Sequence, residues 1–205
     1  MTSAAEYWEN RYREAGRTWS GRANAALVRE VTGLEPGTAL DLGCGEGGDA
    51  LWLAHNGWSV TAVDIAPTAL AVGAGEAAEG DDVDWVAADL AEWRPPTAYD
   101  LVTSHFLHST VELPREEILR RGAAAVAPGG TLLIVGHAGV PHWAAHSPEH
   151  AHVDLPTPEE MLAALRLPPE EWTVVTCALV DRPATAPDGS TGLIADSVLR
   201  LRLRR

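Results

Sequence analysis

Short apolar runs alternate with amphipathic stretches along most of this 205-residue chain. The apolar runs are bounded by Gly, Pro, Asn or Asp, which is typical of buried strands, while the amphipathic stretches have helical spacing. The pattern predicts strands at 38–42, 58–64, 83–89, 99–105, 131–136, 171–181 and 196–204. It predicts helices at 4–16, 25–32, 48–56, 67–78, 115–127 and 157–165.

The order of these elements predicts an α/β fold. Strands that alternate with helices form a parallel sheet with helices on both faces. The last two strands are joined only by a turn-rich loop at 183–189, so they must pair as an antiparallel hairpin. We therefore expect a Rossmann-like, doubly wound sheet of seven strands, mostly parallel with an antiparallel C-terminal hairpin. Residues 1–205 are expected to form a single domain.

A glycine-rich turn follows the first expected strand. Gly43, Gly45 and Gly48 have the G-x-G-x-x-G spacing that lets a backbone turn sharply against a nucleotide-like ligand. The spacing alone also suits NAD. Asp41 changes this picture, because a carboxylate at that place repels a pyrophosphate but attracts a cationic amino-acid group. The turn therefore favours S-adenosylmethionine (SAM) as the ligand.

Acidic residues also end the next two expected strands. Asp64 lies 19 residues after Gly45, where a carboxylate can accept hydrogen bonds from both hydroxyls of a ribose. Asp89, which is followed by Leu90, can accept a hydrogen bond from an adenine amino group. Any one of these acids could instead cap a helix or face solvent in a turn. Three acids at successive strand ends indicate a SAM pocket.

Charge and composition disfavour several kinds of partner, although a local basic patch stays open. The net charge is −14, from 15 Lys and Arg against 29 Asp and Glu, whereas a nucleic-acid-binding protein needs a basic face. No apolar run reaches the ~18 residues of a transmembrane helix, and the N-terminus lacks a signal-peptide pattern. Two cysteines offer no disulfide framework. We expect a cytoplasmic protein with no nucleic-acid or membrane partner, and the oligomeric state stays open.

Seven of the eight histidines fall between residues 105 and 152. His105 ends the fourth expected strand and His137 follows the fifth, so both are expected to face the cleft as catalytic bases. Residues 137–156 form a long His-rich loop that we expect to bind substrate. Four further histidines are candidate metal ligands, although a metal-free substrate loop is favoured: His142, His146, His150 and His152.

The motifs of this chain resemble those of class I SAM-dependent methyltransferases. They lie at 40–47, 60–64, 86–90, 99–102 and 128–135. The resemblance implies that SAM is the methyl donor and is held at these strand ends. The expected cofactor contacts in this part of the chain are Asp41, Gly43, Cys44, Gly45, Asp64, Ile65, Asp89, Leu90 and Ser104. Cys44 is interpreted as a small packing residue of the turn and not as a nucleophile.

The N-terminal region is similar to that of small tellurite-resistance and thiopurine methyltransferases. The similarity lies in residues 7–12 and 19–21. It implies a helical lid over residues 1–33 that closes on the cofactor, with Trp19 and Arg22 beside it.

These observations predict an enzyme that transfers a methyl group from SAM to a small molecule. The acceptor atom can be S, O or N, with a thiol-like acceptor slightly favoured by the N-terminal resemblance. Two other interpretations remain open: a SAM-binding sensor or scaffold without turnover, and an NAD-dependent oxidoreductase.

Overall fold

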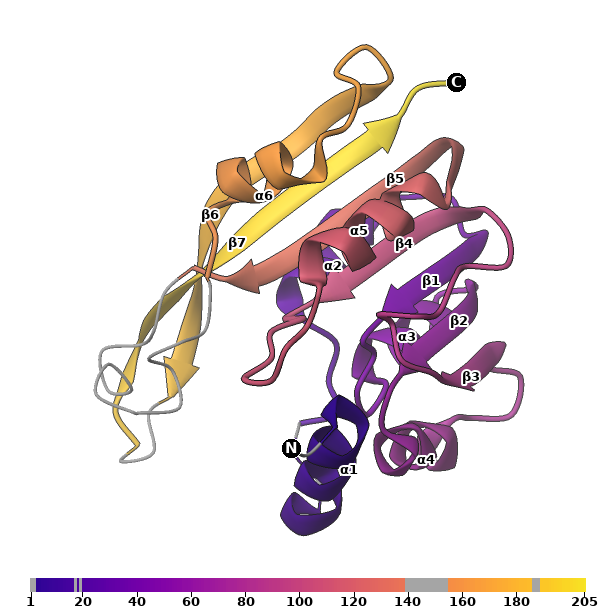
Figure 1. Ribbon diagram of the computed structural model, residues 1–205, viewed down its shortest axis with the longest axis vertical. Helices are drawn as coiled ribbons and strands as arrows, with labels where there is room; N and C mark the ends of the chain where they lie inside the picture. The colour runs from indigo at the N-terminus through magenta and orange to yellow at the C-terminus, as the bar shows by residue number, and fades with distance from the viewer. Residues whose placement is uncertain (1–2, 17, 19, 139–154, 186–188) are drawn as a thin grey trace.

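The computed structural model describes residues 3–16, 18, 20–138, 155–185 and 189–205. In this part of the chain, seven strands form one sheet in the order β3-β2-β1-β4-β5-β7-β6 (Figure 1). The strands are β1 (Thr38–Leu42), β2 (Ser59–Asp64), β3 (Val83–Ala87), β4 (Tyr99–His105), β5 (Val126–His137), β6 (Trp172–Thr185) and β7 (Thr191–Leu203). The helices are α1 (Ala4–Ala15), α2 (Ala25–Val31), α3 (Gly48–His55), α4 (Pro67–Glu76), α5 (Arg115–Ala124) and α6 (Pro158–Leu165).

The direction of the strands confirms the predicted fold class. Strands β1 to β5 run parallel to one another, whereas β7 is antiparallel to both β5 and β6. The molecule is therefore a Rossmann-like seven-stranded α/β fold with an antiparallel C-terminal hairpin. None of its described helices is long and apolar enough to cross a membrane.

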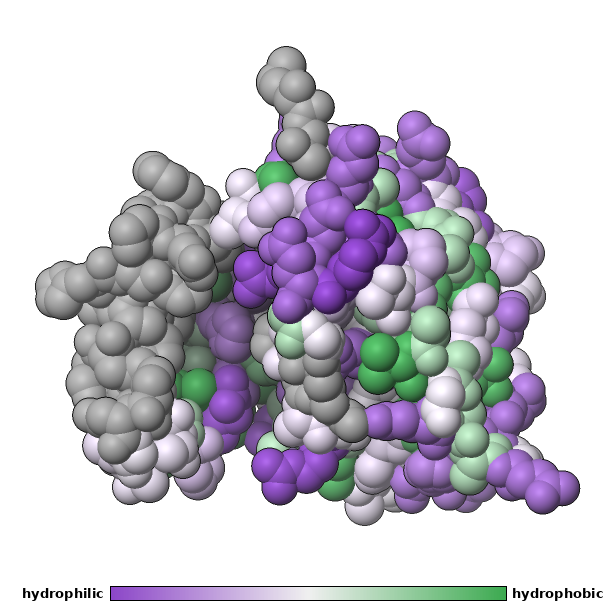
Figure 2. Space-filling view, turned by 90° about the horizontal axis from the view of Figure 1, so that it is seen from below, coloured by the Kyte–Doolittle hydropathy of each residue, from purple (hydrophilic) through white to green (hydrophobic). Residues whose placement is uncertain are grey.

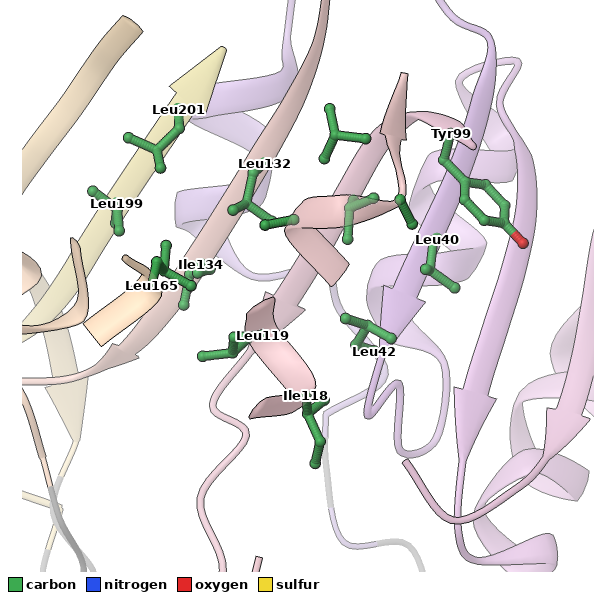
Figure 3. Close-up of a cluster of buried hydrophobic side chains, with 14 of the residues drawn as sticks. Leu40, Leu42, Tyr99, Ile118, Leu119, Leu132, Ile134, Leu165, Leu199 and Leu201 are labelled. Carbon is green, nitrogen blue, oxygen red and sulfur yellow. The ribbon is translucent and has the colours of Figure 1, made fainter. Parts of the chain in front are cut away.

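Strand alternation divides the core between the two faces of the sheet. On one face, Leu42 and Ile134 pack with Ile118 of α5 and Leu165 of α6 (Figure 3). On the other face, residues of β1, β4 and β5 pack against α2 and α3, with Leu27 of α2 fully buried. Because successive residues of a strand point to opposite faces, each central strand contributes to both clusters.

Several predicted boundaries are wrong. Strand β7 begins at Thr191, five residues before the expected position 196, and α5 ends at Ala124, so positions 126 and 127 belong to β5 and not to the expected helix. Strand β3 ends at Ala87, so Asp89 lies in the following turn. Strand β5 begins at Val126, five residues earlier than position 131, because its start pairs with β4 across a register shift. The predicted turn at 183–189 is partly strand, since Pro183 pairs with Leu193. Proline is tolerated there because β6 is the edge strand of the sheet.

Helix α1 docks on the start of α4. Both carboxylate oxygens of Glu9 accept hydrogen bonds from Thr68, one from the hydroxyl and one from the backbone N–H. Trp8 and Tyr12 pack with the small residue Ala66 at the N-terminus of α4. The aromatic stripe of α1 therefore serves packing, and it holds the helix beside the carboxyl ends of the strands.

The contact between α4 and β3 generates a stability prediction. A Cβ atom at Gly73 would lie 2.5 Å from the Trp85 ring and 3.0 Å from the carbonyl oxygen of Glu46. We expect Gly73→Ala to lower the free energy of unfolding by about 1–3 kcal/mol through overpacking. Gly75→Ala in the same helix is the matched control, because no atom lies within 4 Å of its Cβ position. Denaturant unfolding measures the free energy of unfolding of both variants. A Gly73→Ala variant as stable as the wild type would contradict this packing.

Candidate functional site

The carboxyl ends of the parallel strands meet at one edge of the sheet. Figure 1 shows the arrowheads of β1 and β4 pointing to the side of the molecule where α1 lies. Seen from below in Figure 2, the surface is mainly hydrophilic, with smaller apolar areas between the polar residues. In open α/β sheets, ligands bind at this edge.

The glycine turn after β1 folds back toward β2. The backbone N–H groups of Gly43 and Cys44 both donate to the carbonyl of Val63, at 2.9 and 3.1 Å. Gly43 has a φ of 77°, in the left-handed region that favours glycine. Gly48 is needed for close packing instead, since a Cβ there would lie 3.1 Å from the carbonyl oxygen of Arg22.

Asp64 ends β2 beside this turn, as predicted. Its carboxylate accepts hydrogen bonds from the backbone N–H groups of Gly45 and Ala66, both at 2.9 Å. Burial raises its pKa, and these backbone hydrogen bonds partly offset that rise. Ile65 supplies a third backbone hydrogen bond to this carboxylate. An ionised carboxylate has about four acceptor sites, so it can still accept from a further donor such as a ribose hydroxyl.

Asp41 lies inside β1 and is only 2% exposed. Its Oδ2 atom has no hydrogen-bond partner among the described residues. Burial raises the pKa of Asp41 well above its usual range, and repulsion from Asp49 and Asp64 raises it further. A buried carboxylate oxygen without a partner, beside two other acids, fits a cationic ligand group such as the ammonium of SAM.

Asp49 connects three parts of the site, and sequence reasoning missed it. Its carboxylate accepts hydrogen bonds from the backbone N–H and the side-chain amide of Asn24, both at 2.7 Å. The same carboxylate lies 3.1 Å from Nδ1 of His105. The only sequence signal is an acid in the first turn of α3, which also suits an ordinary helix start. Its partner Asn24 is 25 residues away, so the spacing of the motif does not reveal the contact.

His105 occupies a different environment from the open cleft that the sequence predicts. Its side chain is 3% exposed, and Nδ1 also lies 3.1 Å from the hydroxyl of Thr103. Burial lowers the pKa of His105, so the ring is neutral near neutral pH. The side chain faces α3 because residues 101, 103 and 105 of β4 share the α2–α3 face of the sheet.

His137 ends β5, and its side chain is 42% exposed. The ring stacks on Phe106 with a centroid separation of 4.3 Å. Its Nδ1 atom lies 3.9 Å from Oδ1 of Asp196, whose other oxygen accepts a hydrogen bond from Arg182 at 2.6 Å. Phe106 has a φ of 52°, a strained value for a non-glycine residue that often marks a functional site. Neither Phe106 nor Asp196 carries a motif that the sequence analysis could use.

The expected adenine-binding residues lie beyond the end of β3. Asp89 is exposed, and its Oδ1 atom accepts a hydrogen bond from the backbone N–H of Ala91 at 2.8 Å. One carboxylate oxygen of Asp89 thus stabilises the turn, which is the alternative role of a turn acid that the sequence left open. Leu90 is buried in the core, and Ile65 is half-buried directly after β2.

Two smaller residues of the expected cofactor site have packing contacts. The Ser104 hydroxyl is buried and donates to the carbonyl of Leu42 at 3.2 Å, which ties β4 to β1 below the glycine turn. Cys44 is half-buried, and burial followed by the nearby acids raises the pKa of its thiol well above the usual range. The thiol therefore stays protonated, in agreement with its interpretation as a packing residue.

The N-terminal segment contacts the site through Thr18 and Asn24. The backbone N–H of Thr18 donates to Glu46 of the glycine turn at 2.7 Å, and Asn24 is held by Asp49. Arg22 is exposed beside the start of α3. Trp19 lies outside the described residues, and so do His142, His146, His150, His152 and most of the predicted 137–156 loop. Within the described part of the chain, no group of three or more His, Cys, Asp or Glu side chains is arranged to hold a metal.

Comparisons with known proteins agree with this geometry. Residues 39–130 match a family described as "Methyltransferase domain". The 2-heptyl-1-hydroxyquinolin-4(1H)-one methyltransferase of Mycobacteroides abscessus is 32% identical over 57% of this chain. The match covers 54% of that relative, so the chain spans about half its length.

Other similar proteins differ in the acceptor that their names imply. Thiocyanate methyltransferase 1 of Arabidopsis thaliana is 27% identical over 77% of this chain and 71% of that protein. Ribosomal RNA small subunit methyltransferase C of Alcanivorax borkumensis is 27% identical over 67% of this chain and 45% of that protein.

One solved structure superposes on the whole of this chain. It comes from work on the conversion of a disulfide bond into a thioacetal group during echinomycin biosynthesis, and it is 27% identical. The superposition covers 100% of this chain and 93% of the other, with a TM-score of 0.70. These matches show that residues 39–130 resemble the methyltransferase domain family and that the whole chain is similar in fold to this solved structure.

Proposed function

We propose that this protein transfers the methyl group of SAM to a small-molecule acceptor and releases S-adenosylhomocysteine (SAH). The observation that carries the proposal is the buried carboxylate of Asp41, whose Oδ2 lacks a partner among the described residues. An ammonium group would offset the cost of that buried charge, whereas the pyrophosphate of NAD would add to it.

Each strand end would hold one part of the cofactor. Asp64 would accept a hydrogen bond from a ribose hydroxyl, Asp41 would face the ammonium group, and the free oxygen of Asp89 would accept from the adenine amino group. Backbone groups of Gly43, Cys44 and Gly45 would line the methionine side. Ile65, Leu90 and Ser104 would contribute to the walls around the ring, and Trp19 and Arg22 would close the lid.

A sulfur nucleophile is the acceptor that we favour. One similar protein is named for thiocyanate, and one similar structure comes from work on the conversion of a disulfide bond into a thioacetal group. The net charge of −14 supports a small molecule over ribosomal RNA, because a phosphate backbone needs a basic surface. We also propose that residues 1–205 form a single domain and that the protein is cytoplasmic, since its free Cys44 and Cys177 suit a reducing compartment.

The protein would align the two reactants, exclude water from them and provide a proton acceptor. Bound SAM would supply the electrophilic methyl group. His137 is the better placed of the two candidate bases, because its half-exposed ring can exchange a proton with solvent. The carboxylate of Asp196 would stabilise the imidazolium that forms. His105 is enclosed and neutral, so we assign it to positioning Asp49 and the β4 end.

Replacing Asp64 tests the ribose assignment. We expect Asp64→Ala to weaken SAM binding on the order of 100-fold, since hydrogen bonding to a charged acceptor is lost. Isothermal titration measures the affinity, and thermal unfolding without SAM checks that the variant is folded. Asp82→Ala is the matched control, because Asp82 is exposed next to the start of β3. Unchanged affinity in Asp64→Ala would show that the ribose lies elsewhere.

The protonation of Asp41 predicts a pH dependence of SAM binding. Its pKa is raised in the free protein and would fall when an ammonium group binds, so binding releases a proton. SAM affinity should therefore rise with pH until the raised pKa is passed, and then level off. Titration calorimetry in buffers of different ionisation enthalpy measures the released proton.

Asp41→Asn is expected to remove this pH dependence and to weaken SAM binding at least tenfold. The same variant should be more stable than the wild type in the absence of SAM at alkaline pH. The sign follows from linkage: a carboxyl with a raised folded-state pKa contributes stability at low pH that is lost as pH rises through that pKa. A destabilised variant with normal SAM affinity would contradict the assignment.

His137→Gln tests the proposed base. We expect turnover with a thiol acceptor to fall about 10²–10⁴-fold at neutral pH, with SAM affinity within about twofold of the wild type. The deficit should shrink as pH rises, because the thiol then ionises in solution without help. His55→Gln is the control, since His55 lies at the far end of α3. Unchanged turnover in His137→Gln would exclude it as the base.

A further inference from the structure

The proposed base His137 is the first of three polar side chains that form a row across β5, β7 and β6. In the register of the sheet, His137 lies directly opposite Asp196 of β7, and Asp196 lies directly opposite Val180 of β6. Arg182 is two residues further along β6, so it shares the face of Val180 and reaches Asp196 diagonally. Figure 1 shows these three strands side by side at one edge of the sheet.

The two carboxylate oxygens of Asp196 have different surroundings, although the side chain as a whole is only 5% exposed. Oδ2 accepts a hydrogen bond from Nε of Arg182 at 2.6 Å. Oδ1 has no hydrogen-bond partner among the described residues and lies 3.9 Å from Nδ1 of His137. A buried acceptor without a partner costs free energy, so Oδ1 is placed to accept from an N–H group of the neighbouring ring.

This position of Asp196 decides where the neutral His137 ring carries its hydrogen. A carboxylate accepts hydrogen bonds but cannot donate them, so the nitrogen beside it, Nδ1, is expected to carry the hydrogen. Nε2 then holds the lone pair on the other side of a ring whose side chain is 42% exposed. The base atom of the proposed reaction is therefore Nε2.

Arg182 also contacts the aromatic ring on which His137 stacks. Its guanidinium carbon lies 5.7 Å from the centroid of the Phe106 ring, which is within the range of a cation–π contact. Phe106 in turn stacks on His137 at 4.3 Å, with an angle of 29° between the two planes. One arginine thus contacts two of the groups that fix the orientation of His137, the carboxylate at its edge and the phenyl ring on its face.

We propose that Arg182 is a positioning residue for the base: it holds Asp196 at Nδ1 of His137 and Phe106 against the face of that ring, so that Nε2 is presented to the methyl acceptor. The inference rests on the proposed methyl transfer and on His137 as its base. Arg182 needs no contact with either reactant, because it acts through Asp196 and Phe106. An ion pair that only stabilised the β6–β7 hairpin would leave the proton arrangement of His137 unchanged.

Steady-state methyl transfer from SAM to 2-mercaptoethanol tests the effect on catalysis, because this thiol is mostly protonated at neutral pH and needs a base. Arg182→Gln should lower kcat about ten- to a hundredfold, since a small misplacement of a reacting group costs a factor of that order. The KM for the thiol and the affinity for SAM should stay within about twofold of the wild type, as for a group that acts only in the transition state.

Two further variants sharpen this comparison. Arg182→Lys should have an intermediate kcat, since it keeps the charge beside Asp196 but loses the planar guanidinium over Phe106. Arg204→Gln is the matched control and should keep the wild-type kcat. Exposed Arg204 donates from Nε to the hydroxyl of Thr173, at the opposite end of β6 from Arg182.

Long-range proton–nitrogen NMR correlation of the SAH-loaded protein shows which ring nitrogen carries the hydrogen, and it needs no turnover. The signals of His137 are identified by their absence from the spectrum of His137→Gln. In mildly alkaline solution the wild type should carry the hydrogen on Nδ1. Arg182→Gln should shift part of the population to hydrogen on Nε2, the form that free histidine prefers in water. Thermal unfolding checks that the variant is folded, and Arg182→Lys gives the same measurement if Arg182→Gln does not fold.

The outcomes separate the two proposals. Hydrogen mainly on Nε2 in the wild type, an unchanged ring in both Arg182 variants, or a wild-type kcat in Arg182→Gln overturns the positioning role alone. Equal losses of kcat, SAM affinity and thermal stability would also overturn it, because they indicate a purely structural ion pair. Full turnover in His137→Gln, or failure of SAM and SAH to bind, overturns the proposed base or the proposed function, and the role of Arg182 falls with it.

Discussion

The burial of acidic side chains at the carboxyl ends of β1 and β2 is the constraint on which the site depends. Asp41, Asp49 and Asp64 are all less than 9% exposed, and their mutual repulsion adds to the cost of removing charge from water. Backbone N–H groups offset that cost for Asp64, and Asn24 offsets it for Asp49. Among the described residues, Oδ2 of Asp41 has no hydrogen-bond partner, so a cationic ligand would offset the cost of burying its charge.

The same acids organise the approach of the N-terminal segment. Asp49 holds Asn24, Glu46 holds the backbone of Thr18, and Glu9 of α1 holds Thr68. The segment that would cover the cofactor is therefore attached to the residues around the cofactor site.

The end of β5 has a different character from the acidic strand ends. The ring of His137 is stacked between Phe106 and His108, with centroid separations of 4.3 and 5.5 Å. Its Nδ1 atom lies 3.9 Å from Oδ1 of Asp196, so the proposed base is held between aromatic rings and a carboxylate.

The sequence by itself determined the fold class, the strand that carries each motif, and the position of Asp64 beside the glycine turn. These features follow from local pattern and turn chemistry, which a linear sequence displays directly. Only the tertiary structure decided that His105 is enclosed against Asp49, that Asp89 lies beyond its strand, and that Asp196 lies between His137 and Arg182. Each of these depends on which sheet face a side chain occupies and on partners distant in the chain. Spacing along the sequence does not encode such contacts, because packing between elements brings them together.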